Sequence, residues 1–486
     1  MSMLTSPKWS LTSQKPDPMH TISIDNIKKI TRIIGNREKL SERKGIYMKE
    51  KIPYSSMSRN DLLDLKIRLE KEFDKYRAKG LKLDMSRGKP SVKQLNLSMG
   101  MMDVFHSESD LKCEDGTDCR NYGVIDGIPE AKRLLASIAE VPPEEIMIFG
   151  NSSLNVMYDT VSRAYSLGIM GHTPWCKLDS VKFLCPVPGY DRHFKITQEF
   201  GIEMINIPMT PEGPDMDLVE KYVNNDPAVK GIWCVPKYSN PTGISYSDET
   251  VKRFAKLKPA AEDFRIFWDN AYSVHHLYED KRDEILEIIE ACRKAGRPDM
   301  VYKFTSTSKI SFPGSGVAAI AASPANLADI EKHVSAQTIG HDKLNQLRHV
   351  RFFRDRYGIE AQMRRHADIL RPKFEVVEET LERELDGLEI GEWTTPLGGY
   401  FISFDSLDGC AKEIVARAAQ AGVKMTPAGA TFPYGRDPRD RNVRIAPSYP
   451  PLEDLRMAAK LFALCVKVVS VEKILDEQEE KMKEAK

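Results

Sequence analysis

The stretch Ile266-Phe267-Trp268-Asp269-Asn270-Ala271-Tyr272 runs from an apolar segment directly into an acid. A short apolar run without polar alternation is typical of a strand that is buried on both faces of a sheet. An acid at the end of such a strand needs a partner, because an unpaired buried carboxylate is costly. The other interpretation is an aspartate that caps the following helix, and the stretch alone leaves both open.

Apolar runs of the same kind recur along the middle of the chain. They lie at residues 146–149, 181–185, 202–207, 231–235, 301–304 and 317–321, and most are separated by helix-like stretches such as 130–140 and 153–166. Short apolar strands between helices predict an α/β fold with a mostly parallel sheet that helices cover on both faces. Sheets of this type gather their chemistry beyond the carboxyl ends of the strands.

The remaining segments predict further parts of the molecule. Residues 325–380 have a helical, highly charged pattern, while strands at 400–404 and 442–446 mix with helices at 410–421 and 452–468. We expect a disordered leader over 1–57 and an N-terminal helix and arm over 58–90 that belongs with the small domain. We expect a large domain over 91–345, and a bridging helix with a small C-terminal domain over 346–486.

Composition excludes several classes of protein. The 486 residues hold 71 basic and 71 acidic side chains, whereas a nucleic-acid binder usually has a basic excess. No apolar run approaches the roughly 18 to 20 residues that cross a bilayer. Eight cysteines without a Cys-x-x-Cys pair indicate neither a disulfide scaffold nor a zinc site. We therefore expect a cytoplasmic protein that binds no metal, nucleic acid or membrane.

Four other clusters of chemically active side chains stand out, three of them after predicted strands and the last within one. They are Gly150-Asn151-Ser152-Ser153, Asn240-Pro241-Thr242-Gly243, Ser306-Thr307-Ser308-Lys309 and Asn442-Val443-Arg444-Ile445-Ala446. The first cluster precedes a helix, where free backbone N–H groups bind an anion, or where the serine is a simple N-cap. The second is, by itself, a common turn sequence.

Lys309 and Arg444 are the two cations in these clusters. Desolvation of a lysine at a buried strand end favours the neutral, nucleophilic amine, which is suited to a Schiff base with a carbonyl. Ser306 and Lys309 also match the Ser-x-x-Lys pattern of penicillin-recognising hydrolases, but the Ser-Asp-Asn and Lys-Thr-Gly motifs of that family are absent from the sequence. Arg444, within an apolar strand, needs a planar carboxylate from the protein or from a substrate.

In this order, together with Tyr122 and Gly127, the clusters resemble the pyridoxal-phosphate-dependent aminotransferases of fold type I, class I. The resemblance extends from about Ser58 to about Lys473. The segments Arg87-Gly88-Lys89-Pro90, Cys185-Pro186-Val187-Pro188-Gly189-Tyr190 and Ser308-Lys309-Ile310-Ser311-Phe312-Pro313-Gly314 look most like the aspartate aminotransferase branch called subgroup Ic. The resemblance implies a large domain with a mostly parallel seven-stranded sheet and a smaller α/β domain.

The resemblance also implies a role for each site residue. Lys309 would hold pyridoxal 5'-phosphate as a Schiff base and move the proton, Asp269 would pair with the pyridine nitrogen, and Asn240 and Tyr272 would bind the phenolic oxygen. Asn151, Ser152, Ser153 and Ser306 would surround the phosphate, with Tyr122 reaching it from the partner subunit of a homodimer. Arg444 would bind the substrate α-carboxylate, with Gly88 nearby.

Two positions depart from the family pattern. Many relatives carry a phosphate-binding arginine eight positions after the lysine, where this chain has Val317. Val187 occupies the position of the aromatic residue that usually stacks on the cofactor ring, so we expect Tyr190 to contact the ring instead. The cation for a distal substrate carboxylate is left open among Arg87, Lys89 and Arg192.

The function that the resemblance implies is a ping-pong exchange of the amino group of L-aspartate or L-glutamate with a 2-oxo acid, 2-oxoglutarate or oxaloacetate. One alternative is an aminotransferase or β-lyase for another amino acid on the same fold. Another is a non-catalytic, ligand-sensing protein with an aminotransferase-like domain. Such regulators carry an N-terminal winged helix, for which residues 1–57 are too short.

Overall fold

The computed structural model describes residues 51–484, so most of the predicted leader lies outside the described residues. Its last part contains the 3-10 helix η1 (Tyr54–Ser56). Tyr54 is buried, and its backbone N–H donates to the carbonyl oxygen of Leu388 at 3.1 Å. The expectation of disorder up to residue 57 is therefore wrong at Tyr54, which packs against the rest of the fold.

A large sheet forms the centre of the fold, and its strand order is β2-β9-β8-β7-β6-β3-β4-β5. The strands are β2 (Ile146–Ile148), β3 (Lys182–Val187), β4 (Glu203–Thr210), β5 (Gly213–Pro214), β6 (Val229–Cys234), β7 (Arg265–Asp269), β8 (Val301–Ser306) and β9 (Ala318–Ala321). β9 is antiparallel to β2 and β8, and β5 is antiparallel to β4. The expected mostly parallel sheet is confirmed, with the two-residue β5 as an additional edge strand.

Helices cover both faces of this sheet. Neighbouring residues of a strand point to opposite faces, so each strand contributes side chains to two cores. On one face, Ile266 and Trp268 pack in a core with α4 (Pro129–Ala139), α7 (Met216–Asn225), α8 (Asp248–Ala255), α9 (Ile288–Lys294) and α11 (Lys343–Phe353). On the other, Phe267 packs with α5 (Ser153–Leu167), α6 (Asp191–Glu199) and α10 (Pro324–Gln337). The unalternating apolar strands of the sequence are thus explained by burial on both sides.

A second sheet is built from β10 (Gly391–Trp393), β11 (Ile402–Ser406) and β13 (Asn442–Ile445), which pair antiparallel in the order β10-β11-β13. It shares a core with α2 (Arg59–Arg77), α13 (Ala411–Gln420) and α14 (Leu452–Glu484). β1 (Leu83–Asp84) pairs with β12 (Val423–Lys424), which joins the N-terminal arm to the C-terminal part of the chain. α14 is longer than the expected helix at 452–468, and its end packs beside α2 through the Arg59–Glu479 ion pair.

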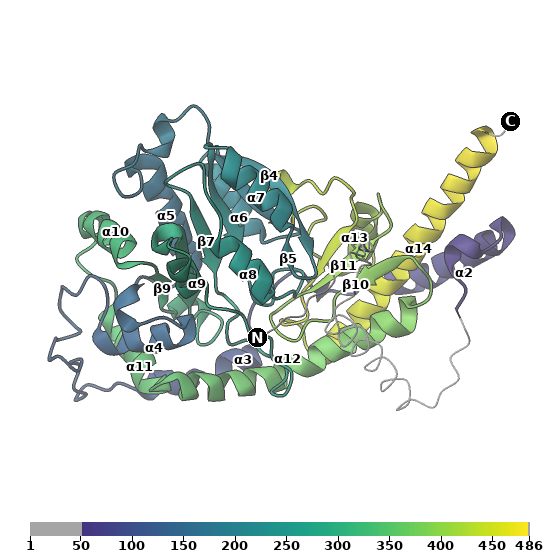
Figure 1. Ribbon diagram of the computed structural model, residues 1–486. Helices are drawn as coiled ribbons and strands as arrows, with labels where there is room; N and C mark the ends of the chain where they lie inside the picture. Colours follow the sequence, from purple (N-terminus) through teal and green to yellow (C-terminus); the bar gives the residue numbers. More distant parts are fainter. Residues whose placement is uncertain (1–50, 485–486) are drawn as a thin grey trace, which may run out of the picture. The chain divides into compact units, whose positions relative to one another are not determined.

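The helix α12 (Arg356–Leu385) connects the two sheets (Figure 1). Ile359 and Met363 near its start belong to the core of the large sheet. Leu370 and Phe374, farther along the same helix, belong to the core of the small sheet. The helix therefore acts as the bridge that its charged helical pattern predicted, while the domain boundaries at residues 90 and 345 stay a prediction.

Shorter elements complete the described chain. They are α3 (Val92–Asn96) and the 3-10 turns η2 (Met99–Asp103), η3 (Pro143–Glu145), η4 (Trp175–Lys177), η5 (Pro298–Met300), η6 (Pro313–Ser315) and η7 (Pro433–Gly435). Among residues 51–484, no helix has both the length and the apolar character needed to cross a membrane.

Replacing Phe374 by alanine tests the packing of α12. Its ring is fully buried, so Phe374→Ala should lower the free energy of unfolding by about 3–5 kcal/mol, measured by urea denaturation. The matched control on the same helix is Tyr357→Ala, because Tyr357 is 78% exposed and should change stability by less than about 0.5 kcal/mol. Equal losses in the two variants would contradict the assignment of α12 to the core.

Candidate active site

The candidate site lies along one edge of the large sheet. β8, β7, β6 and β3 are consecutive, parallel neighbours, so their carboxyl ends meet at the same edge. Ser306 ends β8 and Asp269 ends β7, while Asn240 follows β6 and Tyr190 follows β3. β2 runs in the same direction as β8, because both are antiparallel to β9. The turn that begins with Gly150 therefore reaches this edge as well.

Asp269 is buried, with its side chain only 4% exposed. Its Oδ2 lies 3.0 Å from Nε2 of His193, and its Oδ1 is buried without a hydrogen-bond partner among the described residues. The His193 ring stacks on Trp233, with ring centroids 4.5 Å apart. Asp269 thus has the partner that a buried carboxylate requires, and one oxygen remains for a further donor.

Lys309 follows β8 in a tight turn, in which the N–H of Ile310 donates to the carbonyl oxygen of Thr307 at 2.9 Å. Burial lowers the pKa of the Lys309 amine below its ordinary value, and the charge of Asp269 opposes part of that shift. Nζ lies 4.8 Å from the ring centroid of Tyr272. Tyr272 is buried, and burial raises the pKa of its hydroxyl. These surroundings favour a neutral lysine amine beside a protonated tyrosine.

The turn before α5 has the features of an anion site. Ser152 is the N-cap of α5, but its side chain makes no capping hydrogen bond, which argues against the simple N-cap interpretation. Across the edge, the hydroxyl oxygens of Ser306 and Ser308 are 2.7 Å apart. A Cβ on Gly316 would lie 2.8 Å from the carbonyl oxygen of Asn151, so this glycine lets the two turns approach each other. The helix N-terminus and the hydroxyls supply the donors that an anion needs.

Val317 supplies no charge to this site. It is 2% exposed, and its N–H donates to the hydroxyl of Thr307 at 2.9 Å. The Val317 side chain lies in the core of the large sheet. It therefore does not replace the phosphate-binding arginine that many relatives carry at this position.

Arg444, in the middle of β13, reaches the same edge from the small sheet. Its side chain is 8% exposed, and Nη1 donates to Oδ1 of Asp191 at 2.9 Å and to Oδ1 of Asn240 at 3.3 Å. Nη2 makes a long contact of 3.4 Å with the hydroxyl of Thr426, and Nε is buried without a partner among the described residues. Arg444 is thus held by a protein carboxylate while part of its guanidinium remains unpaired.

The arm that carries Gly88 packs beside Arg444. The guanidinium lies over the ring of Phe401, 4.8 Å from its centroid. A Cβ on Gly88 would fall 2.0 Å from Cζ of the same ring, so only glycine permits this approach. The hydroxyl of Thr426 also donates to the carbonyl oxygen of Ser86 at 3.1 Å. The predicted neighbourhood of Gly88 and Arg444 is therefore seen in the structure.

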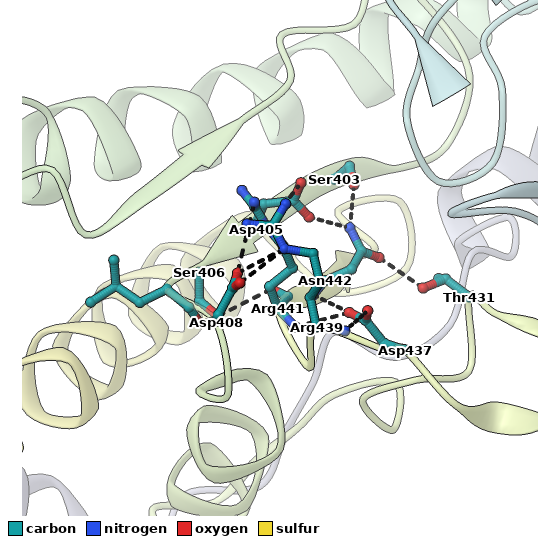
Figure 2. A network of polar contacts seen from close by, with 10 residues as sticks. Ser403, Asp405, Ser406, Asp408, Thr431, Asp437, Arg439, Arg441 and Asn442 are labelled. Atoms are coloured by element: carbon teal, nitrogen blue, oxygen red, sulfur yellow. Dashed lines mark hydrogen bonds and ion pairs between the residues drawn. The ribbon is translucent and has the colours of Figure 1, made fainter. Parts of the chain in front are cut away.

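A polar network fixes the strand that presents Arg444 (Figure 2). Nδ2 of Asn442 donates to the Ser403 hydroxyl at 2.9 Å and to Oδ1 of Asp405 at 2.7 Å, and its Oδ1 accepts from Thr431 at 2.8 Å. The carbonyl oxygen of Thr431 in turn accepts the N–H of Gly189 at 2.8 Å. The network therefore ties β13 to the loop that ends in Tyr190.

The predicted site residues differ in where the structure places them. Tyr190 lies edge-on to His193 with ring centroids 4.9 Å apart, and burial raises the pKa of its hydroxyl. Tyr122 is 81% exposed and is not brought to this edge by its own chain. The three candidates for a distal carboxylate are all exposed, and they are Arg87, Lys89 and Arg192.

Sequence reasoning missed His193, Asp191, Phe401 and Thr426. His193 had a usable signal, because it lies three residues after Tyr190 at the start of a helix that follows a strand end. The other three gave none, since their partners lie far away in the sequence; Asp191 and Arg444 are 253 positions apart.

Comparison with known proteins agrees with this geometry. The sequence model of the aspartate amino-transferase family matches residues 57–478. The chain belongs to this family. It is an aminotransferase, and the expected family and fold class are confirmed.

Related proteins cover nearly all of the matched region. An aspartate aminotransferase from Corynebacterium glutamicum is 44% identical over 405 residues, which are 83% of this chain and 93% of that protein. The crystal structure of an aspartate transaminase from the same species has a TM-score of 0.85 at 42% identity and covers 87% of this chain and 99% of the other. An α-aminoadipate aminotransferase from Thermus thermophilus shares the fold, with a TM-score of 0.65 at 20% identity over 82% of this chain and 95% of the other.

Replacing Asn442 by alanine tests the network behind Arg444 in this aminotransferase. The variant loses two buried and one part-buried side-chain hydrogen bonds, so its free energy of unfolding should fall by about 2–3 kcal/mol in urea denaturation. Asp408→Ala is the control, because the ion pair of Asp408 with Arg439 is exposed and should contribute much less. A loss in Asp408→Ala as large as in Asn442→Ala would contradict the role given to Asn442.

Proposed function

We propose that the protein is a pyridoxal-phosphate-dependent aminotransferase that exchanges the amino group of L-aspartate or L-glutamate with 2-oxoglutarate or oxaloacetate. The observation that carries the proposal is the half-buried, desolvated Lys309 amine on the same strand edge as the half-paired carboxylate of Asp269. The two Corynebacterium relatives named above support the choice of aspartate, since they are described as an aspartate aminotransferase and an aspartate transaminase.

The residues at the edge fit pyridoxal phosphate. The unpartnered Oδ1 of Asp269 suits a protonated pyridine nitrogen, and the N-terminus of α5 with Ser152, Ser153 and Ser306 suits a phosphate. Aminotransferases of this fold use pyridoxal phosphate, and the Thermus α-aminoadipate enzyme was solved with a phosphopyridoxyl-leucine. Asn151, Asn240 and Tyr272 complete the proposed cofactor site, with Tyr190 against the ring and Tyr122 contributed by a partner subunit.

The proposed roles follow from the protonation and pairing of each side chain. When bound, the cofactor supplies an electron sink for the bond that breaks at the substrate α-carbon. Lys309, whose pKa desolvation lowers toward the neutral amine, would accept the α-proton and later return it. His193 holds Asp269 in place, so that its charge keeps the pyridine nitrogen protonated. Arg444, together with the backbone of Gly88, binds the α-carboxylate.

We further propose a homodimer with shared active sites. Tyr122 and Ile339 are 81% and 61% exposed, and both lie in loops that pack on each other. Nζ of Lys343 donates to the carbonyl oxygen of Gly123 at 2.9 Å, next to Tyr122. Two exposed apolar side chains held on one rigid loop pair suit a surface that a second copy covers.

An absorbance titration tests the proposed reaction. The purified holoenzyme should show a cofactor band near the visible edge, and L-aspartate without an oxo acid should convert it to a shorter-wavelength pyridoxamine form. L-Glutamate should do the same, whereas L-alanine and L-phenylalanine should not. A cofactor band that does not change when L-aspartate is added would agree with the fold but exclude L-aspartate as the substrate. No band after addition of pyridoxal phosphate would favour the ligand-sensing alternative.

Lys309→Ala tests the lysine separately. Turnover should fall by at least about a thousandfold, because the variant lacks both the covalent attachment and the proton carrier. The lysine-bound absorbance band should also disappear, while the urea unfolding midpoint of the cofactor-free protein stays near that of the parent. Retention of more than a tenth of the activity would assign the proton transfer to another group.

A further inference from the structure

We infer that Asp191 is a positioning residue for the substrate-binding arginine. By holding Nη1 of Arg444, it leaves the edge formed by Nε and Nη2 to the carboxylate of the substrate. The inference rests on the proposed function, in which Arg444 binds the α-carboxylate, and it adds a residue from the large sheet to that site.

The contacts of Arg444 divide its guanidinium into two parts. Nη1 is occupied twice, by Asp191 at 2.9 Å and by Asn240 at 3.3 Å. Nε has no partner among the described residues, and Nη2 has only the 3.4 Å contact with Thr426. A carboxylate binds best to two parallel N–H groups on one edge of the planar guanidinium, so Nε and Nη2 form the available edge.

The burial of Arg444 explains why its guanidinium is paired with the carboxylate of Asp191. The Arg444 side chain is 8% exposed, and a guanidinium this deeply buried is unstable without an anionic partner. Asp191 supplies that partner when substrate is absent. Its own side chain is 33% exposed and accepts from Nη1 through one oxygen, Oδ1, so it holds Arg444 without blocking the second edge.

The position of Asp191 connects the two halves of the site. It is the first residue of α6, where the N-terminal end of the helix dipole favours an acid. His193, two residues later on the same helix, holds Asp269. The first turn of α6 therefore positions both the carboxylate proposed for the cofactor and the arginine proposed for the substrate.

A competing interpretation makes the opposite prediction. If Asp191 occupied the substrate's own place on Arg444, its removal would free the arginine and tighten substrate binding. If Asp191 positions Arg444, its removal lets the guanidinium turn and weakens binding.

Asp191→Ala and Asp191→Asn distinguish these cases in the holoenzyme. The readouts are the Kd of maleate, a non-reacting dicarboxylate, by calorimetry, and KM and kcat for L-aspartate. Asp191→Ala should raise the Kd and KM about 10- to 30-fold, as expected for loss of a charged hydrogen bond, with kcat changed less than about threefold. Asp191→Asn should raise the Kd less, by about three- to tenfold, because the amide oxygen still accepts from Nη1 but the negative charge is lost. A lower Kd in Asp191→Ala overturns the inference.

Asp226→Ala is the matched control. Asp226 pairs with Lys182 at 3.0 Å and is 28% exposed, so it resembles Asp191 in geometry while contacting no residue of the site. It should leave the maleate Kd unchanged. A rise equal to that of Asp191→Ala would mean that loss of any such ion pair has the same effect, which also overturns the inference.

Combining Asp191→Ala with Arg444→Met shows whether Asp191 acts through the arginine. In the Arg444→Met background, Asp191→Ala should change the maleate Kd by less than about twofold. A tenfold further weakening would assign Asp191 another role. If Arg444→Met alone left maleate binding intact, the proposed carboxylate site would itself be wrong. Weak binding in Arg444→Met with parental binding in Asp191→Ala would reject only the positioning role.

Discussion

The parallel pairing of β3, β6, β7 and β8 is the constraint on which the rest of the structure depends. Each strand ends at the same edge, and each supplies one element of the site there. A slip of one residue in any pair would turn the apolar side chains of that strand from one face to the other. Because both faces are buried under helices, such a slip would also disrupt two cores. Core packing therefore sets the position of Asp269 and Ser306.

Two helices extend this constraint beyond the sheet. α6 follows β3 and carries Asp191 and His193 into contact with Arg444 and Asp269, respectively. α12 contributes side chains to the cores of both sheets. The small sheet that bears Arg444 and the large sheet therefore pack on the same helix. The site is thus assembled by packing between distant segments, and the Asp191–Arg444 ion pair joins the two sheets.

Much of the architecture could be predicted from local pattern. The apolar runs identified every strand of the large sheet except β5, which has only two residues, and the expected boundaries fall within a few residues of the observed ones. Strand ends also marked Asp269, Lys309 and Asn240, because a polar side chain after a buried strand stands out against its surroundings, and Arg444 stood out as a cation within an apolar strand. The burial of Tyr54 was missed, since it depends on a contact with Leu388.

The sequence by itself determined the fold class, the family and the residue types available for chemistry, because periodicity and strand-end motifs are local properties of the chain. Only the tertiary structure decided how those residues are paired. His193 pairs with Asp269, 76 positions away, and Asp191 pairs with Arg444, 253 positions away. Among the described residues, Oδ1 of Asp269 and Nε of Arg444 have no hydrogen-bond partner. The physical reason is that pairing energies act over a few ångströms in space, and no spacing along the chain specifies which distant side chains meet there.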